Sequence, residues 1–308
     1  GGERIIPYKE LASGLSRVGE SWELSGMPGS ESVVAEGPWA GSTLSELIGR
    51  FGAELLGKAN YARFGQEFPL LVKFIDARED LSIQVHPDDE LARKRHGKSG
   101  KCEMWYVLEA EPGASLLTGF SRPIAPAEYE RRVADNTLTD VLNRQAIASG
   151  DVFYLPAGRV HSIGKGSFIV EIQQSSDITY RIYDFDRRDA AGNSRELHTE
   201  LAREAIDFES SENSRITYAP ENNQEVRLVT TPYFTTSLYT LTARTRCDWS
   251  ATDSFVAIVL LQGSGSLTDN EGNRIDVRQG ETWLLPASTQ WTEITPHTAP
   301  LRLLTSRI

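Results

Sequence analysis

The sequence predicts a mainly β protein with two similar β-barrels in tandem, because strand-like segments dominate the chain and one strand–turn–strand unit occurs twice. The strand-like segments alternate with clusters of Gly, Pro, Asn and Asp, a rhythm that is typical of sandwiches and barrels. We expect strands at 69–76, 81–86, 103–109, 151–155, 167–173, 255–261 and 281–285.

Helix-like spacing occurs in three segments. Residues 43–56 carry apolar side chains three and four positions apart, residues 126–145 begin with a proline, and residues 197–208 follow a polar connection that contains glycine. Proline is common in the first turn of a helix, and the apolar spacing gives a helix one buried face. We therefore expect three helices among the strands.

An internal repeat organises the chain. The segment "GDVFYLPAGRVHSI" at 150–163 aligns without gaps to "GETWLLPASTQWTE" at 280–293, and both contain Leu-Pro-Ala. Upstream, "WYVLEAEPGAS" at 105–115 matches "AIVLLQGSGS" at 257–266. A repeat of this kind indicates two copies of one β unit. The connection between the matched strands is longer in the first copy, so we expect a small helical insertion near 121–145.

The two copies differ at polar positions. His161 of the first copy corresponds to Trp291 of the second, and alignment of the upstream strands on their central valines sets Glu103 against Phe255. Side chains that can bind a metal are thus present in one copy and replaced by aromatic residues in the other. We expect one functional barrel and one degenerate barrel.

Bulk composition is that of an ordinary globular protein, with 39% hydrophobic and 24% charged residues among 308. The formal net charge of −11 argues against nucleic acid or an anionic membrane as a partner. An anionic small molecule would need a local cluster of Arg and Lys to overcome that charge.

Apolar runs such as "FVAIVLL" at 255–261 are too short to cross a bilayer, and the start of the sequence has no signal-peptide core. The two cysteines, Cys102 and Cys247, form neither a disulfide framework nor a C-x-x-C pattern. These features predict a cytoplasmic protein.

The segment "SIQVH" at 82–86 raises the question of which way its polar side chains face. On a strand, Ser82, Gln84 and His86 lie on one face and the two apolar residues lie on the other. The polar face could meet solvent, as on an edge strand, or it could meet a buried metal.

A transition-metal site needs three or four N and O donors that converge from different strands. His86, Glu103 and His161, with Gln84 beside them, supply such a set. His161 follows a "PAG" turn that can bring a strand into a barrel mouth, although it could equally be a hydrogen-bonded core histidine. We expect the other histidines to be solvated; they are His96 in a basic loop, His198 on a polar helix and His297 near the C-terminal strand.

The pattern G-x5-P-x-G-x2-H at 150–161 resembles the second conserved motif of cupin barrels. Further strings, in this order, are similar to the short bacterial type I mannose-6-phosphate isomerases over essentially residues 19–188. They are "GESWELS", "AGSTLSEL", "QVHPDD", "GKCEMWYVL", "LPAGRVHSIGKG" and "DITYRIYDFDR". The resemblance implies two jelly-roll cupin barrels in tandem, a catalytic domain at 1–210 and a degenerate domain at 211–308.

The resemblance also implies one Zn²⁺ per chain and a sugar-phosphate substrate. The implied zinc ligands are Gln84, His86, Glu103 and His161. The implied catalytic residues are Lys101, Glu171 and Arg181. The implied phosphate-binding residues are Ser82 and Arg187, and Asp177 matches a supporting carboxylate.

Structural alternatives remain open for several of these residues. Lys101 belongs to "GKSGK", which could be a solvated loop, and Glu171 could lie on the wet face of a strand. Arg187, beside a second arginine, could belong to a surface ion-pair cluster. Trp22 and Trp105 could be core aromatic residues.

The activity that the resemblance implies is interconversion of mannose 6-phosphate and fructose 6-phosphate through an enediol intermediate. Lys101, assisted by Glu171, is the expected proton carrier, while Glu171 itself and a metal-bound water stay open as alternatives. Arg181 would add a fixed positive charge. Two other functions remain open. Two histidines and a carboxylate also suit an iron-dependent cupin dioxygenase, and some cupins bind sugar phosphates without catalysis. We expect a monomer or homodimer without nucleic-acid or membrane partners.

Overall fold

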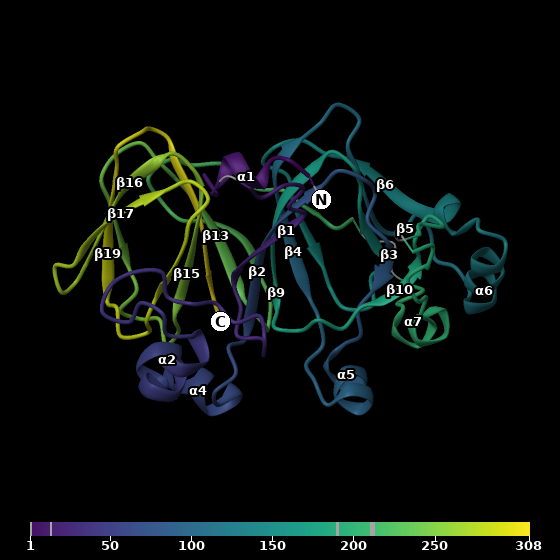
Figure 1. The fold of residues 1–308 in the computed structure, drawn as a ribbon, viewed down its shortest axis with the longest axis horizontal. Coiled ribbons are helices and arrows are strands. Elements are labelled where there is room, and N and C mark those ends of the chain that lie inside the picture. Colours follow the sequence, from purple (N-terminus) through teal and green to yellow (C-terminus); the bar gives the residue numbers. More distant parts are fainter. Residues whose placement is uncertain (1, 13, 189–190, 210–212) are drawn as a thin grey trace. The chain divides into compact units, whose positions relative to one another are not determined.

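The computed structural model describes residues 2–12, 14–188, 191–209 and 213–308 (Figure 1). The chain forms two compact units, and each unit is built from three separate segments of the sequence. The first unit contains the residues up to Ile5, Leu15–Ser21 and Val72–Arg215; the second contains Ile6–Gly14, Trp22–Leu71 and Ile216–Ile308. The expected domain boundary between residues 210 and 211 lies outside the described residues and stays a prediction.

The strands that lie wholly or partly in the first unit form two sheets, ordered β1-β2-β9-β4-β7-β11 and β10-β3-β8-β5-β6. The six-stranded sheet contains β1 (Glu20–Leu24), β2 (Leu70–Ala77), β4 (Glu103–Ala110), β7 (Val152–Leu155), β9 (Ser167–Gln174) and β11 (Arg215–Ile216). The five-stranded sheet contains β3 (Ile83–Val85), β5 (Ser115–Phe120), β6 (Leu142–Ala146), β8 (His161–Ile163) and β10 (Tyr180–Tyr183).

The second unit repeats this plan with sheets ordered β12-β13-β20-β15-β18 and β14-β19-β16-β17. Their strands are β12 (Val226–Thr230), β13 (Thr235–Leu241), β14 (Thr245–Asp248), β15 (Val256–Gln262), β16 (Ser264–Asp269), β17 (Arg274–Arg278), β18 (Thr282–Leu285), β19 (Trp291–Pro296) and β20 (Leu301–Arg307). Each predicted strand is present, and the mainly β prediction is confirmed.

The core of the first unit fills the space between its two sheets. Trp105, Phe153 and Ile169 from the six-stranded sheet pack with Leu116 and Ile163 from the five-stranded sheet. Figure 1 shows the two walls, with β2, β4 and β9 in one and β3, β5 and β10 in the other. These inward side chains alternate with outward ones, which is what a two-residue strand period requires.

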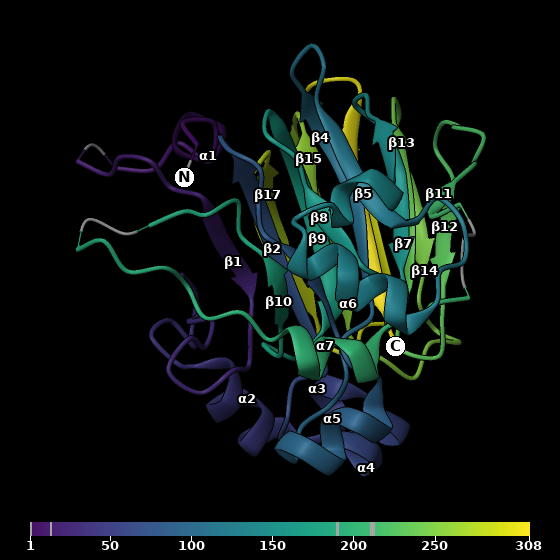
Figure 2. The ribbon, with the colours of Figure 1, turned by 90° about the vertical axis from the view of Figure 1, so that its right-hand side faces the viewer.

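The outer face of the five-stranded sheet is covered by helices. Ile83 and Val85 of β3 pack in one cluster with Tyr129 of α6 (Pro126–Ala134) and Ala202 of α7 (Thr199–Ala205). Figure 2 shows these helices in front of the sheet. Because the apolar residues of "SIQVH" face the helices, the polar face of β3 points between the two sheets rather than into solvent.

Two of the helix predictions need correction. The predicted helix at 43–56 is broken at Gly52, whose φ is 49°, into α2 (Leu44–Phe51) and α3 (Ala53–Leu56). The insertion near 121–145 is helical only in α6 and in the 3₁₀ helix η1 (Leu138–Val141). Its last residues alternate between inward and outward side chains and form β6, which pairs with β5.

The structure also contains helices that were not predicted: α1 (Ile5–Tyr8), α4 (Lys58–Phe64) and α5 (Asp89–His96). The basic segment around His96 is therefore the end of α5, and its prediction as a loop is wrong. Asp88 caps this helix by accepting the N–H of Leu91 at 2.8 Å, and Gly97 ends it with a φ of 65°.

The strand pairing corrects the sequence alignment of the two copies by one residue. Glu103 pairs with Leu155, and in the second unit the residue that pairs with the equivalent Leu285 is Val256. The counterpart of Glu103 is therefore Val256, a core residue, and not Phe255. Two apolar strands can be aligned equally well in neighbouring registers, and only their hydrogen-bonded partners fix which residues correspond.

No helix among the residues that the structure describes is long and apolar enough to span a membrane.

Candidate active site

Three buried side chains with metal-binding atoms meet between the sheets of the first unit. His161 is the first residue of β8, Glu103 is the first residue of β4, and His86 directly follows β3. One ligand atom from each lies within 4.8 Å of the others. Gln84 stands directly opposite His161 in the antiparallel β3–β8 pair. The strands thus bring all four predicted metal ligands together.

Backbone carbonyl groups orient both histidine rings. Nδ1 of His86 lies 2.8 Å from the carbonyl oxygen of Ile178, and Nδ1 of His161 lies 2.8 Å from that of Arg159. Each Nδ1–H therefore donates to a carbonyl, so the lone pair of each ring is on Nε2, the atom that would bind a cation. This arrangement around a ligating histidine is common in metal proteins.

The carboxylate of Glu103 completes a donor set that fits a metal ion. Its Oε1 lies 3.1 Å from Nε2 of His161 and its Oε2 lies 3.5 Å from Nε2 of His86. Both oxygens are buried, and Oε2 also lies 2.9 Å from Nζ of Lys101. Buried carboxylate oxygens normally have polar partners, and a cation bound between Glu103 and the two imidazoles would provide a further one. The side-chain nitrogen of Gln84, 3.3 Å from Nε2 of His161, exchanges places with its oxygen by rotation of the amide.

The protonation states also suit a cation. Burial lowers the pKa of His86 to about 3, and Lys101 acts in the same direction. Burial likewise lowers the pKa of His161. Burial alone would raise the pKa of Glu103, but Lys101, His161 and His86 hold it well below its usual range. The cluster therefore presents two neutral imidazoles and one carboxylate at neutral pH.

Lys101 contacts this cluster directly. Its Nζ lies 2.9 Å from Oε2 of Glu103, 3.1 Å from Nε2 of His86 and 4.0 Å from Oε1 of Glu171. Burial would lower the pKa of Lys101, but Glu103 and Glu171 raise it above its ordinary value. Lys101 is therefore a buried ammonium group and not part of a solvated loop.

Glu171 is 3% exposed, so it does not lie on the wet face of β9. Its Oε2 accepts a hydrogen bond of 2.9 Å from Nε1 of Trp105, and its Oε1 lies 3.5 Å from Nζ of Lys73. Lys73 was missed at the sequence level, although a single lysine within the apolar strand "LLVKFIDA" was a signal. Glu171 thus stands between two lysines.

Arg181 occupies the row of residues that crosses the five-stranded sheet. It pairs with Gln84, which in turn pairs with His161, so the three side chains project from the same face. Nη1 of Arg181 donates to the carbonyl of Glu196 at 3.0 Å, whereas its buried Nε has no hydrogen-bond partner among the described residues.

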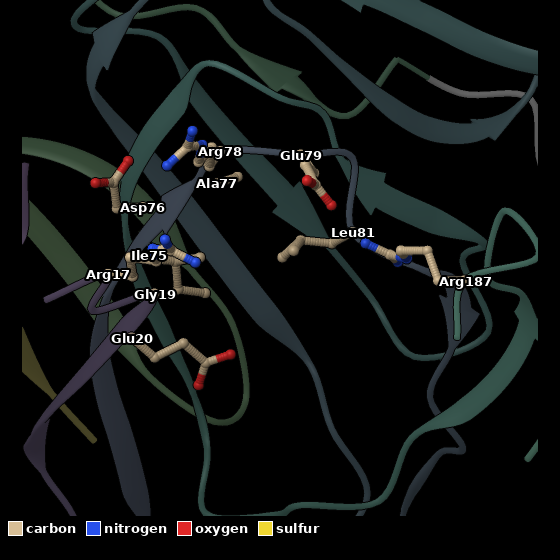
Figure 3. Close-up of a pocket in the computed structure, with 10 residues that line it drawn as sticks. All are labelled: Arg17, Gly19, Glu20, Ile75, Asp76, Ala77, Arg78, Glu79, Leu81 and Arg187. Carbon is tan, nitrogen blue, oxygen red and sulfur yellow. The ribbon is translucent and has the colours of Figure 1, made fainter. Parts of the chain in front are cut away.

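The predicted phosphate-binding residues lie at the edge of this site. Ser82 is buried two positions before Gln84. Arg187 donates from Nη1 to the carbonyl of Asp80 at 2.7 Å and forms an ion pair with Asp184. Arg187 also lines a pocket of about 390 Å³, with Leu81 beside it. Figure 3 shows Arg17, Gly19 and Glu20 on the opposite side of this pocket.

The pocket and the buried cluster are connected by charged side chains. Glu20, in the pocket lining, lies 3.7 Å from Nζ of Lys73, and Lys73 reaches Glu171. Glu171 in turn approaches Lys101 and, through it, Glu103. A ligand in the pocket would therefore lie at one end of a continuous polar path to the candidate metal-binding residues.

Other predicted residues lie elsewhere. Asp177 forms an exposed ion pair with Lys98 at 2.9 Å and is not among the contacts of the metal-binding residues. His96 is hydrogen-bonded to the hydroxyl of Tyr180 at 2.8 Å. His198 precedes α7, where its Nδ1 accepts the N–H of Arg181 at 3.2 Å, so it is not a member of the helix.

Comparisons with known proteins agree with this geometry. The profile of the phosphomannose isomerase type I catalytic domain matches residues 12–117. A mannose-6-phosphate isomerase of Streptococcus mutans is 35% identical over 269 residues, which cover 87% of this chain and 82% of that protein. The mannose-6-phosphate isomerase ManA of Bacillus subtilis is 35% identical over 274 residues, 88% of this chain and 84% of that protein.

The fold is similar as well. A crystal structure of the mannose 6-phosphate isomerase from Bacillus subtilis aligns with a TM-score of 0.89 at 30% identity, covering 100% of this chain and 95% of that one. The expected fold class is thus confirmed. The matches to curated relatives extend over most of both chains. The chain belongs to the type I phosphomannose isomerase family.

Proposed function

We propose that this protein interconverts mannose 6-phosphate and fructose 6-phosphate in the buried cluster of the first unit. The observation that carries the proposal is the buried Glu103 carboxylate, whose oxygens lie 3.1 Å from Nε2 of His161 and 3.5 Å from Nε2 of His86. The Streptococcus mutans and Bacillus subtilis relatives of 35% identity are named mannose-6-phosphate isomerases, which supports the same activity.

The residues that would hold the metal are Gln84, His86, Glu103 and His161. Two imidazoles, one carboxylate and one amide suit zinc, and we infer one zinc ion per chain. When bound, zinc would orient the sugar oxygens and stabilise negative charge that develops on them. The dioxygenase alternative gains no support from the contacts, since the site contains two lysines that oxygen activation does not need.

Lys101 is the group that we assign to proton transfer between C1 and C2 of the sugar. It is an ammonium group in this structure, so it must lose a proton before it can accept one from carbon. Glu171, 4.0 Å from Nζ of Lys101, is placed to take that proton. Trp105 and Lys73 hold the Glu171 carboxylate from the other side.

Arg181 would supply fixed positive charge near the oxygens of the enediol, because its guanidinium remains charged at neutral pH. Ser82 and Arg187 would hold the phosphate at the edge of the site. Local cations are needed there, since the whole chain carries a formal net charge of −11.

The proposal is tested by a coupled assay for fructose 6-phosphate formed from mannose 6-phosphate, with and without a chelator. We expect activity that the chelator removes and zinc restores. His161→Ala should lose both activity and bound zinc, measured by elemental analysis. His297→Ala removes an exposed histidine of the second unit and serves as the control.

Zinc content and fructose 6-phosphate formation, measured separately, distinguish an error in the activity from an error in the metal ligands. If it binds zinc stoichiometrically but forms no fructose 6-phosphate, the metal site stands and the isomerase activity is wrong. If His161→Ala retains both zinc and turnover, the assignment of the metal ligands is wrong.

A further inference from the structure

A single buried carboxylate holds two arginines at the edge of the site. Asp184 directly follows β10, and its side chain is 5% exposed. It forms ion pairs with Arg187 and with Arg195, and Nε of Arg195 donates to its Oδ2 at 2.7 Å. Arg195 lies eleven positions further along the chain, so sequence spacing gives no hint of this contact.

The backbone fixes Arg195 in this place. The segment that contains it runs beside β10, where the N–H of His198 donates to the carbonyl of Arg181 at 2.6 Å. Nη1 of Arg181 donates to the carbonyl of Glu196 at 3.0 Å. Two contacts from Arg181 therefore hold the residues that follow Arg195, and Asp184 holds its side chain.

The cluster has excess positive charge. Burial lowers the pKa of Arg181, and the positive charges of Arg195 and Arg187 lower it further. The carboxylate of Asp184 acts in the opposite direction. Three guanidinium groups and one carboxylate leave two positive charges in a chain that is strongly acidic. An anion would remove this excess.

Hydrogen-bond donors remain for such an anion. Asp184 engages Nε and Nη2 of Arg195, which leaves Nη1, and the Arg195 side chain is 51% exposed. The buried Nε of Arg181 has no partner within the part of the chain that the structure describes. The planar donors of arginine match the oxygens of a phosphate, and a held guanidinium loses less entropy on binding.

The cluster adjoins the substrate pocket. Arg187 lines that pocket opposite Glu20, and Glu20 leads through Lys73 to Glu171. A phosphate held at Arg187 would therefore leave the sugar on the side of the pocket that leads to the proton-transfer residues. Figure 3 shows Arg187 at one end of the pocket.

We propose that Arg195 binds the substrate phosphate together with Arg187, and that Asp184 is the positioning residue that holds both guanidinium groups in place. This assignment rests on the proposed function, because it takes the anion to be the phosphate of a sugar phosphate. Arg195 is then a binding residue of the same site, contributed by the connection between β10 and α7.

The test measures binding of mannose 6-phosphate and of inorganic phosphate to the zinc-loaded full-length protein by calorimetry, together with KM and kcat. Arg195→Gln should weaken both ligands roughly tenfold and raise KM, with kcat within about twofold, because one charge-assisted contact is lost. Arg195→Lys should restore part of the affinity. The control is Arg203→Gln, since Arg203 is 50% exposed and pairs with Glu130 on the surface.

A role for Arg195 in stability alone would lower the melting temperature of Arg195→Gln and leave phosphate affinity unchanged; that result overturns the assignment. A wild-type protein that binds inorganic phosphate in an Arg195-dependent way without isomerase activity would refute the proposed function and support the anion site. An active isomerase whose phosphate affinity is unchanged by Arg195→Gln would support the proposed function and refute the anion site at Arg195.

Asp184→Asn distinguishes two roles of Asp184, which are to hold the arginines in place and to repel the phosphate. Removal of a negative charge beside an anion site should tighten phosphate binding if Asp184 only repels the ligand. It should weaken binding if Asp184 holds the arginines, because an amide oxygen cannot hold two guanidinium groups equally well. Tighter binding of inorganic phosphate by this variant would overturn the positioning role, and Arg195→Gln remains decisive if Asp184→Asn does not fold.

Discussion

The ammonium group of Lys101 lies 2.9 Å from the carboxylate of Glu103, in a cluster where both side chains are buried. The same ammonium is 3.1 Å from Nε2 of His86. Glu103 is therefore shared between Lys101, the group assigned to proton transfer, and the proposed metal ligands. Such sharing ties the charge of the lysine to the state of the metal site.

Lys101→Met should abolish most of the turnover and leave the zinc in place. Loss of a general acid–base group costs roughly 10²- to 10⁴-fold in rate. Lys98→Met is a matched control, because Lys98 makes an ion pair of the same 2.9 Å length but is 52% exposed. The measurements are kcat, the exchange of the transferred proton with deuterated solvent, and zinc content. Wild-type exchange in Lys101→Met would exclude this lysine as the proton carrier.

Trp105→Phe should reduce activity more than a comparable change in the second unit. Nε1 of Trp105 donates to Glu171 at 2.9 Å, and Nε1 of Trp249 donates to Thr292 at 2.9 Å. Both indoles are buried, so each substitution should cost about 1–3 kcal/mol of unfolding free energy. We expect similar losses in denaturant titrations, but a fall in kcat only for Trp105→Phe. Equal kcat values in the two variants would mean that Trp105 does not control Glu171.

Gly158→Ala should disturb the site through the backbone. Gly158 has a φ of +86°, its N–H donates to the carbonyl of His86 at 2.9 Å, and a Cβ there would lie 3.0 Å from the carbonyl oxygen of Ala205. Gly113 has a φ of +84°, and a Cβ at this position would meet open space, so Gly113→Ala measures the conformational cost alone. That cost is about 1 kcal/mol, and Gly158→Ala should exceed it by about 1–2 kcal/mol.

The two glycine variants should also differ in their affinity for zinc. We expect Gly158→Ala to bind zinc more weakly than Gly113→Ala, because the backbone that carries His86 must shift. If competition with a chromogenic chelator gives the same zinc affinity for both variants, the turn at Gly158 does not position the histidine.

The stability of the protein should fall at alkaline pH because of Cys247. Burial raises the pKa of this thiol from 9.0 to about 11. The unfolded chain therefore releases the proton above pH 9 while the folded chain keeps it, so the contribution is complete below pH 9 and is lost between pH 9 and 11. The loss is at most about 1.4 kcal/mol per pH unit. Urea titrations should show a smaller decline for Cys247→Ala; an identical decline would assign the effect to other groups.

The sequence could indicate the buried cluster of Gln84, His86, Glu103 and His161 because local pattern carries most of the information. The alternation in "SIQVH" puts Gln84 and His86 on one face, and the glycine of the "PAG" turn precedes His161 by a fixed spacing. The alternation does not tell which structural element, or solvent, lies against each face of the strand. The helices packed on Ile83 decide that the polar face of β3 is the inner one.

Other features depend on contacts between distant segments. Lys73 and Glu171 meet only because β2 and β9 are neighbours in one sheet, and Arg195 reaches Asp184 only because its segment runs along β10. The alignment of Glu103 with Phe255 failed for a similar reason: strand register is a property of hydrogen-bonded pairs, and a single strand does not reveal it.

The carbonyl group of Ile178, which orients the ring of His86, belongs to a residue 92 positions further along the chain. During synthesis, a nascent chain that has reached residue 170 already contains Gln84, His86, Glu103 and His161. It still lacks the acceptor that fixes the tautomer of His86. Completion of the proposed metal site therefore has to wait until the ribosome has synthesised the segment around Ile178, so the order of translation itself sets when the site can reach its final geometry.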